Sequence, residues 1–143
     1  MNMLVGSLTF LPLLMAAFAH FIWAFGFTWP IRDEALLVRT VVGTPGATRM
    51  PNRLLTFVIA LCILAAGIVA LSIADHDSGG VLWTIIGALL ALLFLGRGIA
   101  GYTPRWRAAH STEPFASLDR KTYSPICLWI GAGFAILVLM RLL

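Results

Sequence analysis

Residues 54–74 read LLTFVIALCILAAGIVALSIA, an apolar run without a single charged side chain. At a rise of about 1.5 Å per residue, a helix of this length covers about 30 Å, the thickness of the hydrocarbon core of a bilayer. Backbone polar groups find no water in that medium, so a helix that satisfies its own hydrogen bonds is the structure to expect. The run therefore predicts a membrane-spanning helix.

Three further runs of the same kind lie on either side of it, at 4–27, 81–102 and 125–142. Only 11% of the residues are charged, against about 25% in a typical soluble domain. The loops that remain are too short to hold a soluble domain. The sequence thus predicts an all-α integral membrane four-helix bundle, with 1–143 forming a single transmembrane domain.

The first run contains Ala17-Phe18-Ala19, a small-x-small pattern that is typical of a signal-peptide cleavage site. No Lys or Arg precedes this pattern, and the apolar residues continue for two more turns beyond it. We therefore expect a retained helix.

Prolines and small residues indicate where the predicted helices bend, begin and touch one another. Pro12 lies inside the first run and predicts a kink, and Ser124-Pro125 predicts an N-cap followed by the first turn of the last helix. In lipid, helices associate through close backbone packing, so pairs of small residues mark the expected contact faces. These pairs are Ala66 and Ala70, Gly98 and Gly101, and Gly131 and Gly133.

The basic residues are concentrated in two loops. Loop 28–53 and loop 104–123 carry four each, whereas the turn at 75–80 carries none. The positive-inside rule places these two loops in the cytoplasm and both termini outside. No basic stripe interleaved with aromatic residues accompanies the net charge of +4, so we expect no nucleic-acid partner. The basic residues concerned are Arg32, Arg39, Arg49 and Arg53 in the first loop, and Arg105, Arg107, Arg120 and Lys121 in the other.

Within the first loop, residues 31–42 read IRDEALLVRTVV. Charged and apolar residues alternate there in a pattern that fits a short helix in the membrane interface. An ordered loop without a helix is the alternative.

Two ionisable residues lie inside predicted spans, and such residues are costly enough to suggest a function. His20, Trp23 and Gly26 share one helix face, which could form one wall of a small amphiphilic pocket. Arg97 could form the other wall, where it would attract an anionic head group or pair with Asp119. Purely structural roles are the alternative: a hydrogen bond for His20, an aromatic anchor for Trp23 and a snorkelling side chain for Arg97.

The predicted orientation brings both groups to the cytoplasmic side, level with Glu34 from the first loop. We therefore predict a ligand-binding set at this level, consisting of His20, Trp23, Arg97, Asp119 and Tyr123.

The sequence carries no catalytic motif, and it has neither a Cys-x-x-Cys pair nor a Cys/His cluster. Haem ligation would have to use His20 and His110, and no other feature supports it. We predict no catalytic residues, no metal site and no cofactor.

Two stretches resemble a known family, the small bacterial membrane proteins grouped as domain of unknown function 3995. The resemblance implies a four-helix protein of the bacterial inner membrane and brings no established activity, substrate or cofactor. It also suggests that His20, Trp23, Asp119 and Tyr123 belong together. The stretches are His20-x-x-Trp23-x-x-Gly26, and Arg97-Gly98 followed by Pro114-Phe115-Ala116-Ser117-Leu118-Asp119-Arg120, Tyr123-Ser124-Pro125-Ile126-Cys127-Leu128 and Gly131.

Three functions are compatible with these features. The first is a non-enzymatic bundle that binds a lipid-like ligand or supports a membrane assembly, with membrane lipids, a lipophilic ligand and protein partners or a second copy as its partners. The second is an enzyme for a lipophilic substrate at the cytoplasmic interface, with His20 as general base and Arg97 holding an anion. The third is an accessory subunit of a respiratory or transport complex.

Overall fold

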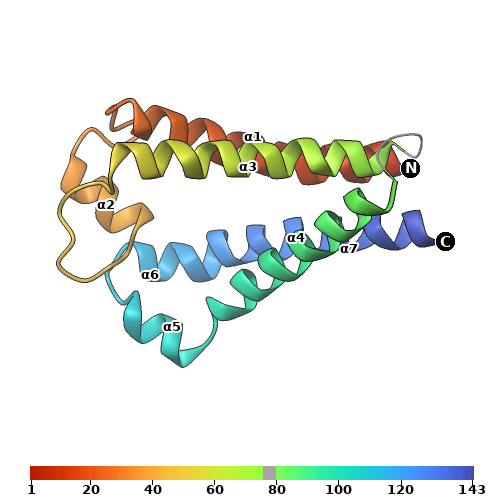
Figure 1. Ribbon diagram of the computed structural model, residues 1–143. Coiled ribbons are helices and arrows are strands. Elements are labelled where there is room, and N and C mark those ends of the chain that lie inside the picture. Colours follow the sequence, from red (N-terminus) through yellow and green to blue (C-terminus); the bar gives the residue numbers. More distant parts are fainter. Residues whose placement is uncertain (76–79) are drawn as a thin grey trace.

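The computed structural model describes residues 1–75 and 80–143; residues 76–79, within the turn predicted at 75–80, lie outside the described part. Four long helices run in alternating directions, each antiparallel to the one before it (Figure 1). They are α1 (Asn2–Ala24), α3 (Arg53–Ala74), α4 (Gly80–Ala100) and α7 (Ser124–Leu142). All four are long and apolar enough to cross a membrane, which confirms the predicted all-α fold and identifies a multi-pass membrane protein.

The long helices are arranged as two pairs. α1 lies beside α3, and α4 lies beside α7, which also packs against α1. Both termini lie at one end of the molecule, and the two long loops fold together at the other end (Figure 1).

The core lies where the two pairs meet. Leu13, Ile73, Phe134 and Leu137 are almost completely buried there. Many other large apolar side chains are exposed on the outer faces of the long helices. Such a surface would be unfavourable in water, but it matches lipid as the solvent.

The predicted small-residue contacts are confirmed, because all six of these residues are buried. A Cβ atom added to Gly131 would come within 2.7 Å of the Leu95 side chain on α4. A Cβ added to Gly133 would overlap the hydroxyl of Thr9 on α1. Glycine at these two positions therefore lets α7 approach α4 and α1 closely at the same time.

Pro12 lies inside α1 without ending the helix. Proline has no N–H, so the carbonyl of Leu8, four residues earlier, loses its usual helical partner. The indole N–H of Trp129 on α7 donates a hydrogen bond to this carbonyl over 3.1 Å. A neighbouring helix thus satisfies the backbone group that Pro12 leaves free in the membrane.

α1 ends one turn earlier than the apolar run 4–27 predicted. Gly26 adopts a left-handed conformation with φ of 89°. Its N–H donates to the Trp23 carbonyl over 3.0 Å, and the Phe27 N–H donates to the Ile22 carbonyl over 3.1 Å. This pair of bonds is a Schellman C-cap, which stops a helix regardless of the apolar residues that follow.

The last helix, in contrast, begins earlier than predicted. Its α7 segment follows directly on α6 (Phe115–Leu118) and a π-helical turn, η1 (Asp119–Tyr123). The prediction that Ser124 caps the helix with its side chain was wrong. In the π-helical turn the Ser124 N–H bonds to the Asp119 carbonyl, five residues back. This wider turn makes room for the ring of Pro125, which would clash with the preceding turn of a regular α-helix.

Both long loops contain helices. Residues 34–41 of the stretch predicted as helix or loop form α2 (Glu34–Val41), which Asp33 caps through a 3.2 Å bond to the Leu36 N–H. Loop 104–123 contains α5 (Pro104–Ala109), α6 and η1. α2 packs against α6 and buries Leu37 and Val38 completely, so the two loops form one folded cap over this end of the bundle.

Candidate functional site

An ion pair occupies the loop end of the α4–α7 pair. Nη2 of Arg97 lies 2.7 Å from Oδ1 of Asp119, whose side chain is 4% exposed. The Trp106 indole N–H donates to the other carboxylate oxygen over 2.9 Å, and Nη1 of Arg97 donates to the Ser124 hydroxyl over 3.4 Å. The guanidinium also lies 4.2 Å from the centre of the Trp106 ring. We call these four residues the Arg97 cluster.

This arrangement satisfies a buried charge almost completely. Both oxygens of Asp119 have a partner, and the positive charge of Arg97 faces the carboxylate and an aromatic ring. A buried carboxylate is tolerated only when it is paired and hydrogen-bonded in this way. The Arg97 cluster is therefore well suited to hold α4, α5 and η1 together.

Aromatic rings extend the Arg97 cluster towards α2. His110 stacks on Trp106 with ring centres 4.1 Å apart, and Phe115 lies between His110 and Tyr123. The Tyr123 hydroxyl then donates to the Thr40 carbonyl at the end of α2 over 3.0 Å. Tyr123 thus joins the two long loops.

His20 and Trp23 lie together near the end of α1, with ring centres 5.0 Å apart. Nδ1 of His20 donates to the Ala16 carbonyl of its own helix over 2.7 Å. The indole N–H of Trp23 is also used, because it donates to the Trp29 carbonyl over 2.8 Å. The indole N–H of Trp23 is therefore already used within the protein, and its ring surface is the part left for other contacts.

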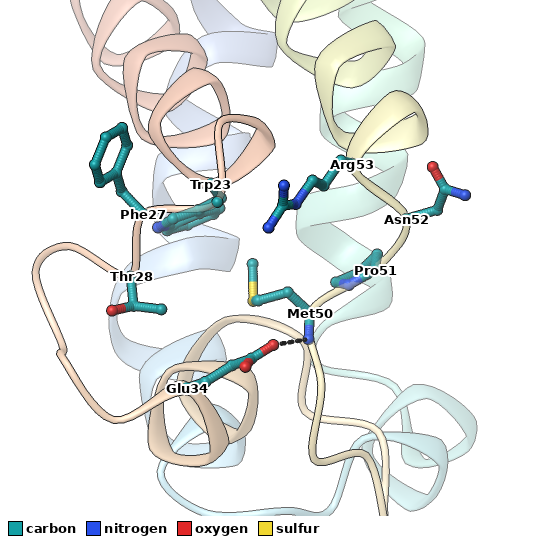
Figure 2. Close-up of a pocket in the computed structure, with 9 residues that line it drawn as sticks. Trp23, Phe27, Thr28, Glu34, Met50, Pro51, Asn52 and Arg53 are labelled. Carbon is teal, nitrogen blue, oxygen red and sulfur yellow. Dashed lines mark hydrogen bonds between the residues drawn. The ribbon is translucent and has the colours of Figure 1, made fainter.

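A cavity of about 460 Å³ opens beside Trp23, between the end of α1 and the start of α3. Its volume falls within the range of roughly 300–1,000 Å³ that is usual for small-molecule sites. Figure 2 shows the indole of Trp23 on one side, Met50 near the centre and charged side chains above and below it. We call it the α1–α3 cavity; its lining residues are Trp23, Gly26, Phe27, Thr28, Glu34, Met50, Pro51, Asn52 and Arg53.

Arg53 supplies the positive charge of the α1–α3 cavity. Its guanidinium lies against the backbone of Gly26, where a Cβ atom would come within 2.7 Å of Nη2. Among the residues that the structure describes, no hydrogen bond or ion pair neutralises Arg53. It is also the first residue of α3, where the helix dipole disfavours a cation. An anion in the cavity would relieve both conditions.

Glu34 supplies the negative charge from the start of α2. Its Oε1 accepts the Met50 N–H over 3.1 Å, which fixes the carboxylate against the segment that leads into α3 (Figure 2). No ion pair joins Glu34 to Arg53 within the described ranges 1–75 and 80–143.

A smaller cavity of about 230 Å³ lies beside the Arg97 cluster, and its lining includes His110, Glu113 and Arg120. No group of three His, Cys, Asp or Glu side chains suited to a metal ion occurs in the part of the chain that the structure describes.

A family model described as protein of unknown function, DUF3995, matches residues 13–134. The chain belongs to the DUF3995 family. The match confirms the resemblance seen in the sequence, and it spans the residues of both the Arg97 cluster and the α1–α3 cavity. No curated protein and no solved structure matches the chain.

The structure divides the predicted ligand-binding set of this DUF3995 protein into two groups. Arg97 and Asp119 form the ion pair that was one of the alternatives given for Arg97, and Tyr123 lies on the adjoining aromatic chain. His20 and Trp23 lie on α1, and no described hydrogen bond or ion pair connects them to Arg97. Of these two, only Trp23 lines the α1–α3 cavity.

The positive charge of the α1–α3 cavity, Arg53, was predicted only as one of the basic loop residues that set the orientation. One sequence signal could have singled it out: a cation at the first position of a membrane helix, directly after the capping Asn52. For Met50 the sequence offers no such signal. Its place depends on how the first loop folds back onto α2.

Proposed function

We propose that this DUF3995 protein binds a lipid-like ligand in the α1–α3 cavity and has no catalytic role. One observation carries the proposal: Arg53, which has no partner among the described residues, lines a cavity of about 460 Å³ at the end of two membrane helices. Phosphate or carboxylate groups of amphiphiles lie at this level of a bilayer, where arginine binds them through its planar set of donors.

The surroundings of the α1–α3 cavity support an amphiphile over a water-soluble anion. Phe25, Phe27 and Trp29 at the end of α1 are 60–67% exposed, as is typical of the aromatic belt at a membrane interface. Leu54 on α3 is exposed beside Arg53. A ligand with its charged group in the cavity could therefore lay its apolar part along these side chains.

The distribution of basic residues supports an orientation in which the α1–α3 cavity faces the cytoplasm of a bacterial cell. Both long loops carry Arg and Lys, so they belong on the cytoplasmic side and both termini outside the inner membrane. The enzymatic alternative gains no support, because His20 lines neither of the two cavities described. A role in a membrane assembly or a larger complex stays a prediction.

Native mass spectrometry of the protein purified from membranes in mild detergent tests this proposal. We expect the wild type to retain one phospholipid, and the lipid-bound fraction to fall about tenfold in Arg53→Gln, which removes one charge-assisted contact. Arg49→Gln is the matched control, because it removes the same charge from the same loop outside the cavity lining. A lipid-free wild type, or equal retention by Arg53→Gln, would refute the proposal.

A further inference from the structure

Glu34 is the feature of the α1–α3 cavity that simple anion binding does not explain. A carboxylate that lines the same cavity as Arg53 repels the phosphate or carboxylate that Arg53 attracts. Its presence therefore restricts the kind of ligand that fits.

The two charges do not neutralise each other. In Figure 2, Arg53 and Glu34 approach the cavity from opposite sides, with Met50 between them. Neither Arg53 nor Glu34 forms an ion pair with any residue that the structure describes. The cavity thus holds a separated positive and negative charge.

The carboxylate of Glu34 is held in place without being saturated. Oε1 accepts the Met50 N–H over 3.1 Å, whereas Oε2 has no hydrogen-bond partner among the described residues. A carboxylate fixed in this way can accept a further hydrogen bond from a ligand without first losing side-chain entropy.

We propose that the α1–α3 cavity recognises a zwitterionic group of the phosphoethanolamine type, with its phosphate on Arg53 and its primary ammonium on Glu34. This inference rests on the proposed lipid-binding function and names its ligand class. A purely anionic group would be repelled by Glu34, and a purely cationic group by Arg53. A zwitterion whose two charges are separated satisfies both side chains at once.

A competition experiment with defined lipids tests the inference. Delipidated protein in detergent is mixed with equal amounts of phosphatidylethanolamine and phosphatidylglycerol, and the bound ratio is measured by native mass spectrometry. We expect the wild type to favour phosphatidylethanolamine about tenfold, the ratio that one charge-assisted hydrogen bond of about 1.4 kcal/mol provides. In Glu34→Gln the ratio should fall to about one, since the ammonium loses its anionic partner.

The Glu34→Gln variant keeps the loop intact, because the glutamine carbonyl can still accept the Met50 N–H. Glu113→Gln is the matched control: Glu113 also accepts a backbone N–H, that of Ser117 over 3.2 Å, but it lies outside the α1–α3 cavity. It should keep the tenfold preference. A wild-type ratio near one, or an unchanged ratio in Glu34→Gln, would overturn the zwitterion inference while lipid binding through Arg53 still held.

Soluble competitors show whether the cavity recognises the free head group or only the whole lipid. Displacement of phosphatidylethanolamine by free phosphoethanolamine, but not by inorganic phosphate, would show that the head group alone is recognised. If neither competitor displaces the lipid and the lipid ratio still depends on Glu34, the cavity binds the whole lipid and not the head group alone. Equal displacement by inorganic phosphate would overturn the inference.

Discussion

At the scale of single residues, Arg97 and Arg53 differ in how their charges are balanced. Arg97 faces Asp119 at 2.7 Å and lies over the ring of Trp106, so its charge is used within the protein. Arg53 has no such partner among the described residues and borders a cavity. This difference is why we propose a structural role for Arg97 and a ligand-binding role for Arg53.

The ion pair of Arg97 and Asp119 should stabilise the folded protein by more than the two side chains would contribute separately. Asp119→Asn leaves the guanidinium without its counter-charge, and we expect it to lower the free energy of unfolding by about 1–3 kcal/mol. This is below the cost for a fully buried pair because the Arg97 side chain is 28% exposed and can reach water.

Thermal unfolding in detergent of the single variants and of Arg97→Gln/Asp119→Asn measures this coupling. The double variant should lose less stability than the sum of the two single variants. Strictly additive losses would show that the pair contributes nothing of its own.

The need of Arg97 for a counter-charge could be predicted from the sequence, because an ionisable residue inside a membrane span is costly. The sequence was not sufficient to place Arg53 or Met50. Their positions follow from the bond between Glu34 and Met50, which joins residues 16 positions apart in a loop without periodicity.

At the scale of elements, the helices were predictable as spans but not at their ends. Apolar length identifies the run 4–27, whereas the C-cap at Gly26 depends on backbone conformation and stops α1 earlier. The run 125–142 likewise omits the π-helical turn, because Asp119 and its neighbours look like a polar loop until Arg97 neutralises the carboxylate.

One hydrogen bond between helices allows a quantitative prediction of stability. Trp129→Phe removes the donor to the Leu8 carbonyl, which Pro12 leaves without a helical partner. We expect it to lower the free energy of unfolding by about 1 kcal/mol, the usual size of a hydrogen bond between membrane helices. In a Pro12→Ala background the same change should cost nearly nothing, because the Ala N–H can bond that carbonyl.

Denaturation in mixed micelles, monitored by circular dichroism, measures the loss in free energy of unfolding that Trp129→Phe causes in each of the two backgrounds. Trp83→Phe on α4 is the control for the loss of indole volume, since Trp83 packs against the core without a hydrogen bond in the described structure. Equal costs of Trp129→Phe in both backgrounds would contradict the account of Pro12.

At the scale of the whole molecule, the two ends of the bundle differ. At the end with the termini, Arg141 donates to the Ile73 carbonyl over 3.4 Å and ties α7 to α3. At the other end, the two long loops form the folded cap, which contributes Trp106 and Asp119 to the Arg97 cluster and borders the α1–α3 cavity. The lateral surface between the ends is apolar. The loop end, where the charged side chains of the candidate site and the two described cavities lie, is therefore where we propose that a ligand binds.

Photo-crosslinking inside the α1–α3 cavity tests this central claim most directly. Met50, near the centre of the cavity, is replaced by p-benzoylphenylalanine, and the delipidated protein is irradiated with added phosphatidylethanolamine. Our account predicts an increase in intact mass by one lipid, which persists with Arg49→Gln and disappears with Arg53→Gln. The absence of an adduct, or an equal yield with Arg53→Gln, would contradict it.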